Sequence, residues 1–278
     1  MQQEDLAYLV QMLRRRSGLA LNQPKAAAIE NRLAPVMRRF GFRDLHSLID
    51  ELRHGREAMA RAVTEAMTTN ESSFFRDRAT FEQFRDAVLP ELLRRRAATR
   101  RLRIWSAACA AGQEAYSIAL LLDDLKLRAQ GWTVDVIASD ISSEMIERAE
   151  QGLYSHFEVQ RGLPIRRLVE SFIQEGPNWR ISEPLRRMVE FRRFNLLDSF
   201  GWLDSVDVVF CRNVLMYLND KTKAGVLDKI AEVLAPDGYL VLGPVETVQG
   251  LSNEFEAICG ALGIYGKSRR LLSFAATA

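Results

Sequence analysis

The sequence predicts an α/β protein in which an open, mostly parallel sheet follows a small helical domain. Two observations support this fold class. The first 65 or so residues repeat apolar side chains only at helical spacing. From residue 102 onward, short apolar runs alternate with helical segments and with glycine or proline turns, as in strands joined by crossover helices. The length of 278 residues suffices for one or two domains.

Short helices are expected at the N-terminal end of the chain. In residues 26–40, apolar side chains recur at helical spacing, which predicts an amphipathic helix. Pro35 lies inside this segment and is expected to kink or divide the helix. Gly41 is expected to end it. Further helices are expected at residues 42–53, 57–67 and 80–101.

Strands and helices alternate in the rest of the chain. Strands are expected at residues 102–108, 134–140, 189–195, 206–213 and 238–243. Helices are expected within 109–128, at 141–152 with Ser142 as N-cap, and at 220–238, closed by Pro236 and Gly238. Residues 153–188 interrupt the alternation with a small element, and residues 264–274 can supply an antiparallel hairpin at the sheet edge.

The charge of the chain is nearly balanced, with a formal net charge of +2. The chain therefore has no strong overall positive potential of the kind that favours binding of nucleic acid. Residues 1–64 hold eleven Lys and Arg against seven Asp and Glu. Lys25, Arg32 and Arg39 are spaced seven apart and form a basic stripe. This stripe is either a surface on which an acidic partner docks or an ordinary solvated surface.

Several chemistries find no support in the sequence. The three cysteines have no paired spacing, and Cys109 and Cys211 are expected to be small buried residues. The three histidines are scattered and do not resemble a metal site. The start lacks a signal-peptide pattern, and no apolar run reaches membrane-spanning length. We expect a soluble, cytoplasmic protein.

Ligands of such sheets bind outside the carboxyl ends of the strands, where the strand order reverses. Gly112 and Glu114 follow the first strand, and Asp140 ends the second, where a carboxylate can accept hydrogen bonds from ribose hydroxyls. The chain has neither GxGxxG nor GxxxxGK[ST], so phosphate binding is not indicated. This favours S-adenosylmethionine over NAD or ATP.

Each of these residues also has a purely structural interpretation. Asp140 can be a strand-end turn residue, Glu114 a carboxylate favoured by the helix dipole, and Gly112 a tight turn. Arg212, Asn213 and Tyr217 follow the fourth strand and are expected to face the cleft.

The stretch TTNESSFFRD, residues 68–77, fits neither helical nor strand spacing. Its polar groups, paired aromatics and cation are typical of the edge of a binding site. With RIWSAACAAGQEAYSIAL, IASDISSEMIERAEQGLY, FNLLD, VVFCRNVLMYL and LAPDGYLVLG, it resembles the chemotaxis receptor methyltransferases, often called CheR, over nearly the whole chain.

The resemblance implies a Rossmann-like class I methyltransferase domain, a small helical N-terminal domain and a small inserted β subdomain. The implied boundaries are residues 1–66 for the helical domain, 67–101 for a linker and helix closing over the cofactor, and 102–278 for the methyltransferase domain, with the insert at about 153–188. The implied reaction moves a methyl group from S-adenosylmethionine to receptor glutamates, leaving S-adenosylhomocysteine.

The resemblance also implies roles for individual residues. Asn70, Ser72 and Arg76 would contact S-adenosylmethionine, with Arg76 beside the methyl-transfer site. Glu114 and Asp140 would hold the amino-acid and ribose groups, with Gly112 in the turn between the strand and the helix. The remaining roles fall to Asn195 and Leu196 beside the adenine, to Arg212 and Asn213 lining the cleft, and to Tyr217 facing the transferred methyl.

The sequence departs from the family pattern at three places. The turn reads AAGQEA instead of a Ser-Thr-Gly-Glu-Glu-Pro-like run, so Ala110, Ala111 and Gln113 lack the usual polar groups. GPVE replaces the usual Gly-His-Ser-Glu, which puts the role of that loop in doubt. The loop FIQEGPNWRISEP is short, which predicts that no receptor C-terminal pentapeptide is needed as a tether.

The expected function is thus methylation of glutamates in the cytoplasmic helical bundle of chemoreceptors by a monomer recruited to receptor arrays, with the basic stripe as docking face. One alternative is a regulatory module that senses S-adenosylmethionine without methyl transfer. Another is a small-molecule or nucleic-acid methyltransferase, which the motif set and the balanced charge disfavour.

Overall fold

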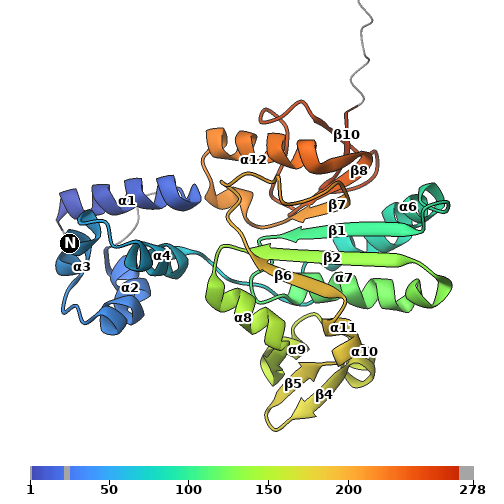
Figure 1. Ribbon diagram of the computed structural model, residues 1–278, viewed down its shortest axis with the longest axis horizontal. Helices are drawn as coiled ribbons and strands as arrows, with labels where there is room; N and C mark the ends of the chain where they lie inside the picture. Colours follow the sequence, from blue (N-terminus) through green and yellow to red (C-terminus); the bar gives the residue numbers. More distant parts are fainter. Residues whose placement is uncertain (1, 22–25, 269–278) are drawn as a thin grey trace, which may run out of the picture.

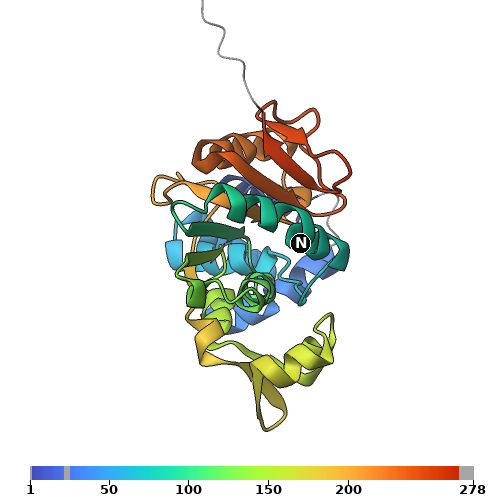
Figure 2. The ribbon, with the colours of Figure 1, turned by 90° about the vertical axis from the view of Figure 1, so that its right-hand side faces the viewer.

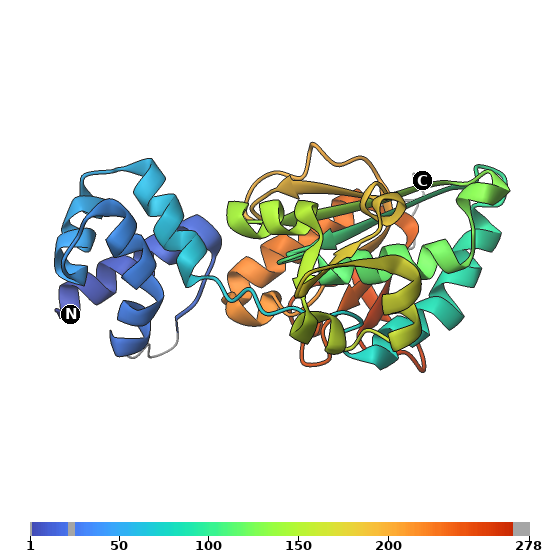
Figure 3. The same cartoon turned by 90° about the horizontal axis from the view of Figure 1, so that it is seen from below.

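The computed structural model describes residues 2–21 and 26–268. Figure 1 shows a helical domain beside a larger domain built on a twisted sheet, and Figure 3 shows the linker that runs between them. A small β subdomain projects from the large domain, as Figure 2 shows in yellow.

The N-terminal domain is a bundle of four helices with its own core. Its helices are α1 (Gln3–Ser17), α2 (Ala26–Phe40), α3 (Leu45–Arg53) and α4 (Glu57–Met67). Each helix contributes a fully buried side chain: Leu13, Leu33, Leu48 and Val63. Of the two expected effects of Pro35, a kink or a division of the helix, the division does not occur, since α2 is continuous. Pro35 lies on the exposed face, where water can satisfy the carbonyl that loses its helical partner.

The large sheet is open and mostly parallel, as expected. Its strand order is β6-β2-β1-β7-β8-β10-β9. The first five are parallel, and β10 runs antiparallel to both β8 and β9. The strands are β1 (Arg101–Ala107), β2 (Thr133–Asp140), β6 (Val189–Arg193), β7 (Val206–Cys211), β8 (Leu234–Leu242), β9 (Phe255–Ala257) and β10 (Ile264–Lys267). The order reverses beside β1, which places a binding crevice at its carboxyl end.

Helices cover both faces of the sheet, because successive strand residues point to opposite sides. On β1, Ile104 belongs to the core shared with α5 (Arg78–Gln83), α6 (Leu89–Arg95) and α7 (Gln113–Asp124). Trp105 belongs to the other core, which α12 (Asp220–Val233) covers. Between α5 and α6 lies one π-helical turn, η1 (Phe84–Val88). The helix expected over residues 80–101 is therefore not a regular α-helix throughout, and it ends earlier, at Arg95.

The inserted subdomain is a three-stranded antiparallel sheet in the order β3-β5-β4. Its elements are β3 (Leu153–Ser155), α9 (His156–Gln160), α10 (Ile165–Ser171), β4 (Phe172–Glu175), β5 (Asn178–Ile181) and α11 (Glu183–Arg186). It follows α8 (Ser143–Gln151), which begins at the predicted N-cap Ser142, whose side chain accepts a hydrogen bond from the Met145 N–H.

The structure corrects the segment after β7. The helix α12 ends at Val233, and Pro236 and Gly238 lie inside β8 rather than closing a helix. Leu234 already pairs with Val206 and is buried, and a register shift before Tyr239 absorbs the proline and glycine. The edge hairpin forms from β9 and β10, while the expected residues 269–274 lie outside the described residues.

Among the described residues, no helix combines the length and apolar character needed to cross a membrane.

A buried carboxylate ties two helices of the N-terminal domain together. Asp5 on α1 is 1% exposed and accepts hydrogen bonds from His46 Nδ1 at 2.8 Å and Arg53 Nη2 at 3.1 Å, both on α3. The hydrogen bond with His46 lowers the pKa of Asp5 in spite of burial. The same hydrogen bond, reinforced by the charge of Asp5, raises the pKa of His46 above its ordinary value of 6.5.

This pairing predicts a pH-dependent stability. Because the pKa of His46 is raised on folding, its stabilisation is complete below its ordinary pKa and is lost as pH rises through the raised value. The thermal midpoint of the wild type should therefore fall between about pH 6 and about pH 9 more than that of His46→Gln. His54→Gln, at an exposed histidine of the same domain, is the control. Equal pH slopes in the wild type and His46→Gln would contradict the assignment.

Candidate active site

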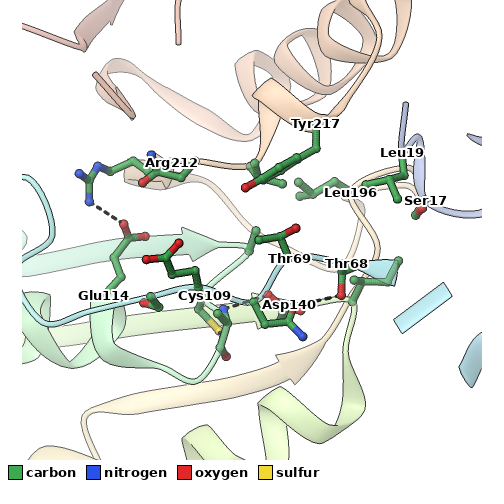
Figure 4. Close-up of a pocket in the computed structure, with 18 of the residues that line it drawn as sticks. Ser17, Leu19, Thr68, Thr69, Cys109, Glu114, Asp140, Leu196, Arg212 and Tyr217 are labelled. Carbon is green, nitrogen blue, oxygen red and sulfur yellow. Dashed lines mark hydrogen bonds and ion pairs between the residues drawn. The ribbon is translucent and has the colours of Figure 1, made fainter. Parts of the chain in front are cut away.

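A pocket of about 970 Å³, including its open mouth, lies at the carboxyl ends of β1, β2 and β7. The linker after α4 and the end of α1 complete its walls (Figure 4). Every residue predicted to bind the cofactor or act in catalysis, except Gly112, lines it. These are Asn70, Ser72, Arg76, Glu114, Asp140, Asn195, Leu196, Arg212, Asn213 and Tyr217.

The linker TTNESSFFRD is held over the pocket by its aromatic side chains. Phe74 is fully buried in edge contact with Tyr154 at 5.0 Å and Phe172 at 5.5 Å between ring centroids. The Phe75 N–H donates a hydrogen bond to Ser117 Oγ at 2.9 Å. A Cβ at Gly162 would lie 2.0 Å from the Phe74 carbonyl oxygen, so the linker packs directly on the inserted subdomain. Its polar residues are left to line the pocket.

A buried guanidinium joins the linker to the sheet. The Arg212 side chain is 1% exposed and donates to Glu114 Oε2 at 2.9 Å, to Asp77 Oδ2 at 2.8 Å and to the Arg76 carbonyl at 2.9 Å. The other oxygen of Glu114 accepts from Ser106 Oγ at 2.8 Å. Two carboxylates share one cation, so this cluster carries a net negative charge when all three are ionised.

Asp140 closes the floor of the pocket at the end of β2. Its carboxylate accepts hydrogen bonds from the Ala110 N–H and the Ser142 N–H, both at 2.9 Å. Burial raises the pKa of Asp140 above its ordinary value, although the two backbone donors oppose the rise. Ala108 and Ala110 both adopt positive φ, so the alanine turn is a strained backbone shape that the Asp140 hydrogen bond helps to hold.

Gly112 is not among the residues that line the pocket. Its φ is +88°, and a Cβ there would lie 2.9 Å from Ala149 Cβ and 3.2 Å from Phe191 Cζ. The structure thus gives Gly112 a packing role, which lets the start of α7 approach α8 and β6 closely. Cys109 and Cys211 are buried and free, as expected, and burial raises the pKa of both thiols.

The helical domain contributes directly to the pocket. Asn195 Nδ2 donates to the Arg16 carbonyl at 2.6 Å, and the Ala20 N–H donates to the Tyr217 carbonyl at 2.8 Å. The Tyr217 ring packs against the helical core, and Figure 4 shows its hydroxyl pointing into the pocket from the side opposite Asp140. The two domains therefore contact each other directly around the pocket and are not joined by the linker alone.

The predicted basic stripe is only partly a free surface. Arg32 donates to the Met67 carbonyl at 2.9 Å and to Thr69 Oγ1 at 3.2 Å, so it caps α4 and steadies the linker. Arg39 is exposed and its guanidinium lies 5.5 Å from the centroid of the Phe40 ring. Lys25 lies outside the described residues. Docking by this stripe stays a prediction.

Sequence reasoning missed Glu246, in the GPVE loop whose role was in doubt. Glu246 is 8% exposed and accepts four backbone hydrogen bonds, from Gly243 at 2.8 Å, Asn213 at 2.7 Å, Val214 at 3.0 Å and Met216 at 3.2 Å. It therefore shapes the loop that presents Asn213 and Tyr217. The available signal was the glutamate that GPVE retains from the family motif.

Glu246→Gln should lower the free energy of unfolding by about 2 to 4 kcal/mol, because one amide oxygen cannot serve four N–H donors. Urea denaturation measures this loss. Glu256→Gln, at an exposed carboxylate on β9, is the matched control and should change stability by less than about 0.5 kcal/mol. Equal stability of the two variants would show that Glu246 does not hold the loop.

Comparison with known proteins agrees with this geometry. Residues 70–263 match the CheR methyltransferase SAM-binding domain, and residues 4–68 match the CheR methyltransferase all-alpha domain. The chain is 36% identical to chemotaxis protein methyltransferase 1 of Pseudomonas aeruginosa over 261 residues, covering 92% of this chain and 95% of that protein. It is 37% identical to chemotaxis protein methyltransferase Cher2 of Pseudomonas putida over 262 residues, covering 91% and 93%. The chain therefore belongs to the CheR family of S-adenosylmethionine-binding methyltransferases.

Proposed function

We propose that this protein methylates the side-chain carboxylate of specific glutamates in the cytoplasmic helical bundle of chemoreceptors. The products are glutamyl methyl esters and S-adenosylhomocysteine. The observation that carries the proposal is one pocket lined both by the carboxylates Glu114 and Asp140 and by Arg76 and Tyr217. Acceptors suited to the cofactor thus lie beside donors suited to a substrate carboxylate.

The pocket fits S-adenosylmethionine chemically. Glu114 and Asp77 outnumber their shared cation Arg212, which favours a positively charged ligand. Each oxygen of Asp140 accepts one backbone N–H and keeps a lone pair free for ribose hydroxyls. We propose that Glu114 receives the amino group, that Asp140 binds the ribose, and that Asn195 and Leu196 border the adenine. Asn70 and Ser72 would contact the cofactor from the linker.

The chemistry requires little beyond positioning. When bound, S-adenosylmethionine supplies a methyl group that its sulfonium makes electrophilic. A substrate glutamate, with an ordinary pKa of about 4.3, is ionised at neutral pH and needs no general base. Its negative charge is neutralised as the reaction proceeds, so a pocket that excludes water and aligns the reactants lowers the barrier.

Arg76 and Tyr217 are proposed to steer the substrate carboxylate. Arg76 donates to the Glu71 carbonyl at 2.9 Å and lines the pocket, so its guanidinium can also form a charge-assisted hydrogen bond with the substrate. Pairing that was too tight would weaken the nucleophile, so we assign Arg76 an orienting role. The Tyr217 hydroxyl, which points into the pocket, can hydrogen-bond the same carboxylate (Figure 4).

The first test uses labelled S-adenosylmethionine and receptor-containing membranes from the source cell. Methyl esters hydrolyse in mild base, so label on receptor protein should be base-labile. Arg76→Ala should lower kcat by about 100-fold and cofactor affinity much less, because the main role proposed for Arg76 is to orient the substrate carboxylate. Arg78→Ala, two residues on and paired with Glu82 at the surface, is the matched control and should leave kcat unchanged.

Two outcomes would contradict the proposal. Base-stable label would indicate a nitrogen or thioether product. Cofactor binding without any label, on receptors that another enzyme of this family methylates, would favour the alternative of a regulatory module. The alternative is motivated by the alanine turn, which lacks the polar side chains of the family pattern. Its backbone is nevertheless held in place, because the Ala110 N–H donates to Asp140 and the Ala111 carbonyl accepts from the Tyr154 hydroxyl.

We further propose that a receptor C-terminal pentapeptide is not required. The β4–β5 hairpin turns at Gly176 with no long loop between its strands, whereas family members that dock on such a pentapeptide have a longer loop there. Removing the last five residues of the receptor should leave kcat/KM for methylation unchanged. A loss of about tenfold or more would show that the tether contributes binding free energy.

We propose that the enzyme acts as a monomer in the cytoplasm and is recruited to membrane receptor arrays by its substrate. The helical domain would take part in docking through its basic stripe, in which Arg32 and Arg39 are both exposed and Arg32 already binds Met67 and Thr69. Charge complementarity with a glutamate-rich bundle motivates this assignment.

A further inference from the structure

A second groove lies where the C-terminal end of α1 meets the first turns of α12. Its volume is about 960 Å³ including its open mouth, and it is separate from the pocket. On α1 it is lined by Gln11, Arg14 and Arg15, and on α12 by residues from Lys221 to Lys229. Figure 1 shows the end of α1, at the left, directed toward the near end of α12, which lies above the sheet. We refer to this feature as the α1–α12 groove.

The groove is preformed by close packing of its two sides. A Cβ at Gly18, the C-cap of α1, would lie 2.7 Å from Thr222 Cγ2 on α12 and 3.3 Å from Leu197 Cδ2. The backbone of Leu19 forms a β-bridge with Leu218. The end of α1 is thus clamped against α12, and the groove does not depend on a flexible hinge.

The groove carries only positive charge. No Asp or Glu lines it within residues 2–21 and 26–268. Arg14, Arg15 and Lys221 are exposed, and no hydrogen bond or ion pair engages these three side chains in that part of the chain. Lys229 is held by the Leu196 carbonyl at 2.6 Å and the Asp198 carbonyl at 2.9 Å. Three uncompensated cations therefore face an open groove, a pattern complementary to an acidic partner.

Gly225 provides an independent indication of a partner. It lies inside α12, where glycine destabilises a helix relative to alanine. A Cβ at this position would meet no atom within 4 Å, so packing inside this structure gives no reason for glycine. Gly225 leaves a flat floor in the middle of the groove, where the backbone of a partner can approach closely.

The dimensions favour a protein segment over a small anion. From Lys221 to Lys229, α12 rises about 12 Å, and from Gln11 to Arg15, α1 rises about 6 Å. The cations are therefore spread along the groove. At the N-terminal end of α12, where a phosphate would bind, the Asn219 side chain already accepts a hydrogen bond from the Thr222 N–H, and Asp220 adds a negative charge.

The groove also adjoins the pocket. Leu196 and Leu218 line the pocket, while the next residues, Leu197 and Asn219, line the groove. The two share this wall. A partner bound in the groove would therefore lie beside the pocket in which a substrate side chain reacts.

We propose that the α1–α12 groove binds an acidic helical segment of the methyl-accepting protein. The identity of this partner rests on the proposed function, whereas the acidic character of the occupant rests on the groove itself. Binding there would place the substrate next to the pocket without adding any group to the chemistry.

The test measures binding of a fluorescently labelled, purified cytoplasmic fragment of a chemoreceptor from the source cell, with S-adenosylhomocysteine present. Lys221→Glu should weaken binding at low salt, and Arg15→Glu with Lys221→Glu should weaken it about tenfold or more. Lys126→Glu, at an exposed lysine in the loop after α7, is the matched control. Binding of S-adenosylhomocysteine, measured by calorimetry, should be unchanged in all variants.

Gly225→Gln separates a binding role from a structural one. Glutamine favours helix more than glycine, so the thermal midpoint should stay equal or rise. The side chain fills the groove, so affinity for the receptor fragment should fall severalfold and KM for methylation should rise while kcat is retained. A merely structural position would not combine higher stability with weaker binding.

The outcomes distinguish this inference from the proposed function. If the wild type methylates the fragment and the groove variants bind it as tightly as Lys126→Glu does, the groove inference is wrong. If inorganic tripolyphosphate binds in an Arg15-dependent manner while fragment binding is unaffected, the groove is a phosphate site and the inference is equally wrong. If the fragment binds through the groove but receives no methyl group, the groove inference holds and the proposed reaction fails.

Discussion

The pocket depends on one buried guanidinium. Arg212 follows β7 and reaches Glu114 at the start of α7, together with Asp77 and the Arg76 carbonyl of the linker. A buried charge left without partners is strongly destabilising, so these contacts must form together. The linker is consequently fixed over the carboxyl ends of the strands, and Arg76 is positioned so that it lines the pocket. The same cluster leaves one negative charge in excess, which suits a cationic cofactor.

Glu246 provides the complementary constraint on the opposite wall. Its buried carboxylate accepts hydrogen bonds from four backbone N–H groups, three of which belong to the loop after β7. Asn213 is held there at a φ of +57°, and the short helix η3 (Leu215–Tyr217) follows. A buried cation and a buried anion thus shape consecutive parts of one loop. Because backbone groups satisfy most of these hydrogen bonds, the loop geometry tolerates the altered GPVE sequence.

The helical domain is part of the active unit. Its α1 closes the pocket, its Arg32 holds the linker at Thr69, and its C-cap Gly18 packs on α12. The surface that we propose for substrate docking is therefore composite, with cations from α1 and α12 along one groove. Such a surface can orient a protein substrate while the chemistry is left to the pocket.

The sequence by itself determined the alternation of strands and helices, the cleft at the reversal of strand order, and the family. These follow from local spacing and from motifs at strand ends, since parallel strands bring their carboxyl ends to one edge. Glu114 and Asp140 could be selected for this reason. Only the tertiary structure decided the partners of Arg212, the role of Glu246, the packing role of Gly112 and the placement of Pro236 inside β8. Each of these depends on contacts between residues distant in sequence, which no local pattern encodes. The α1–α12 groove likewise forms where residues distant in sequence pack together, Gly18 against Thr222 and Leu19 against Leu218.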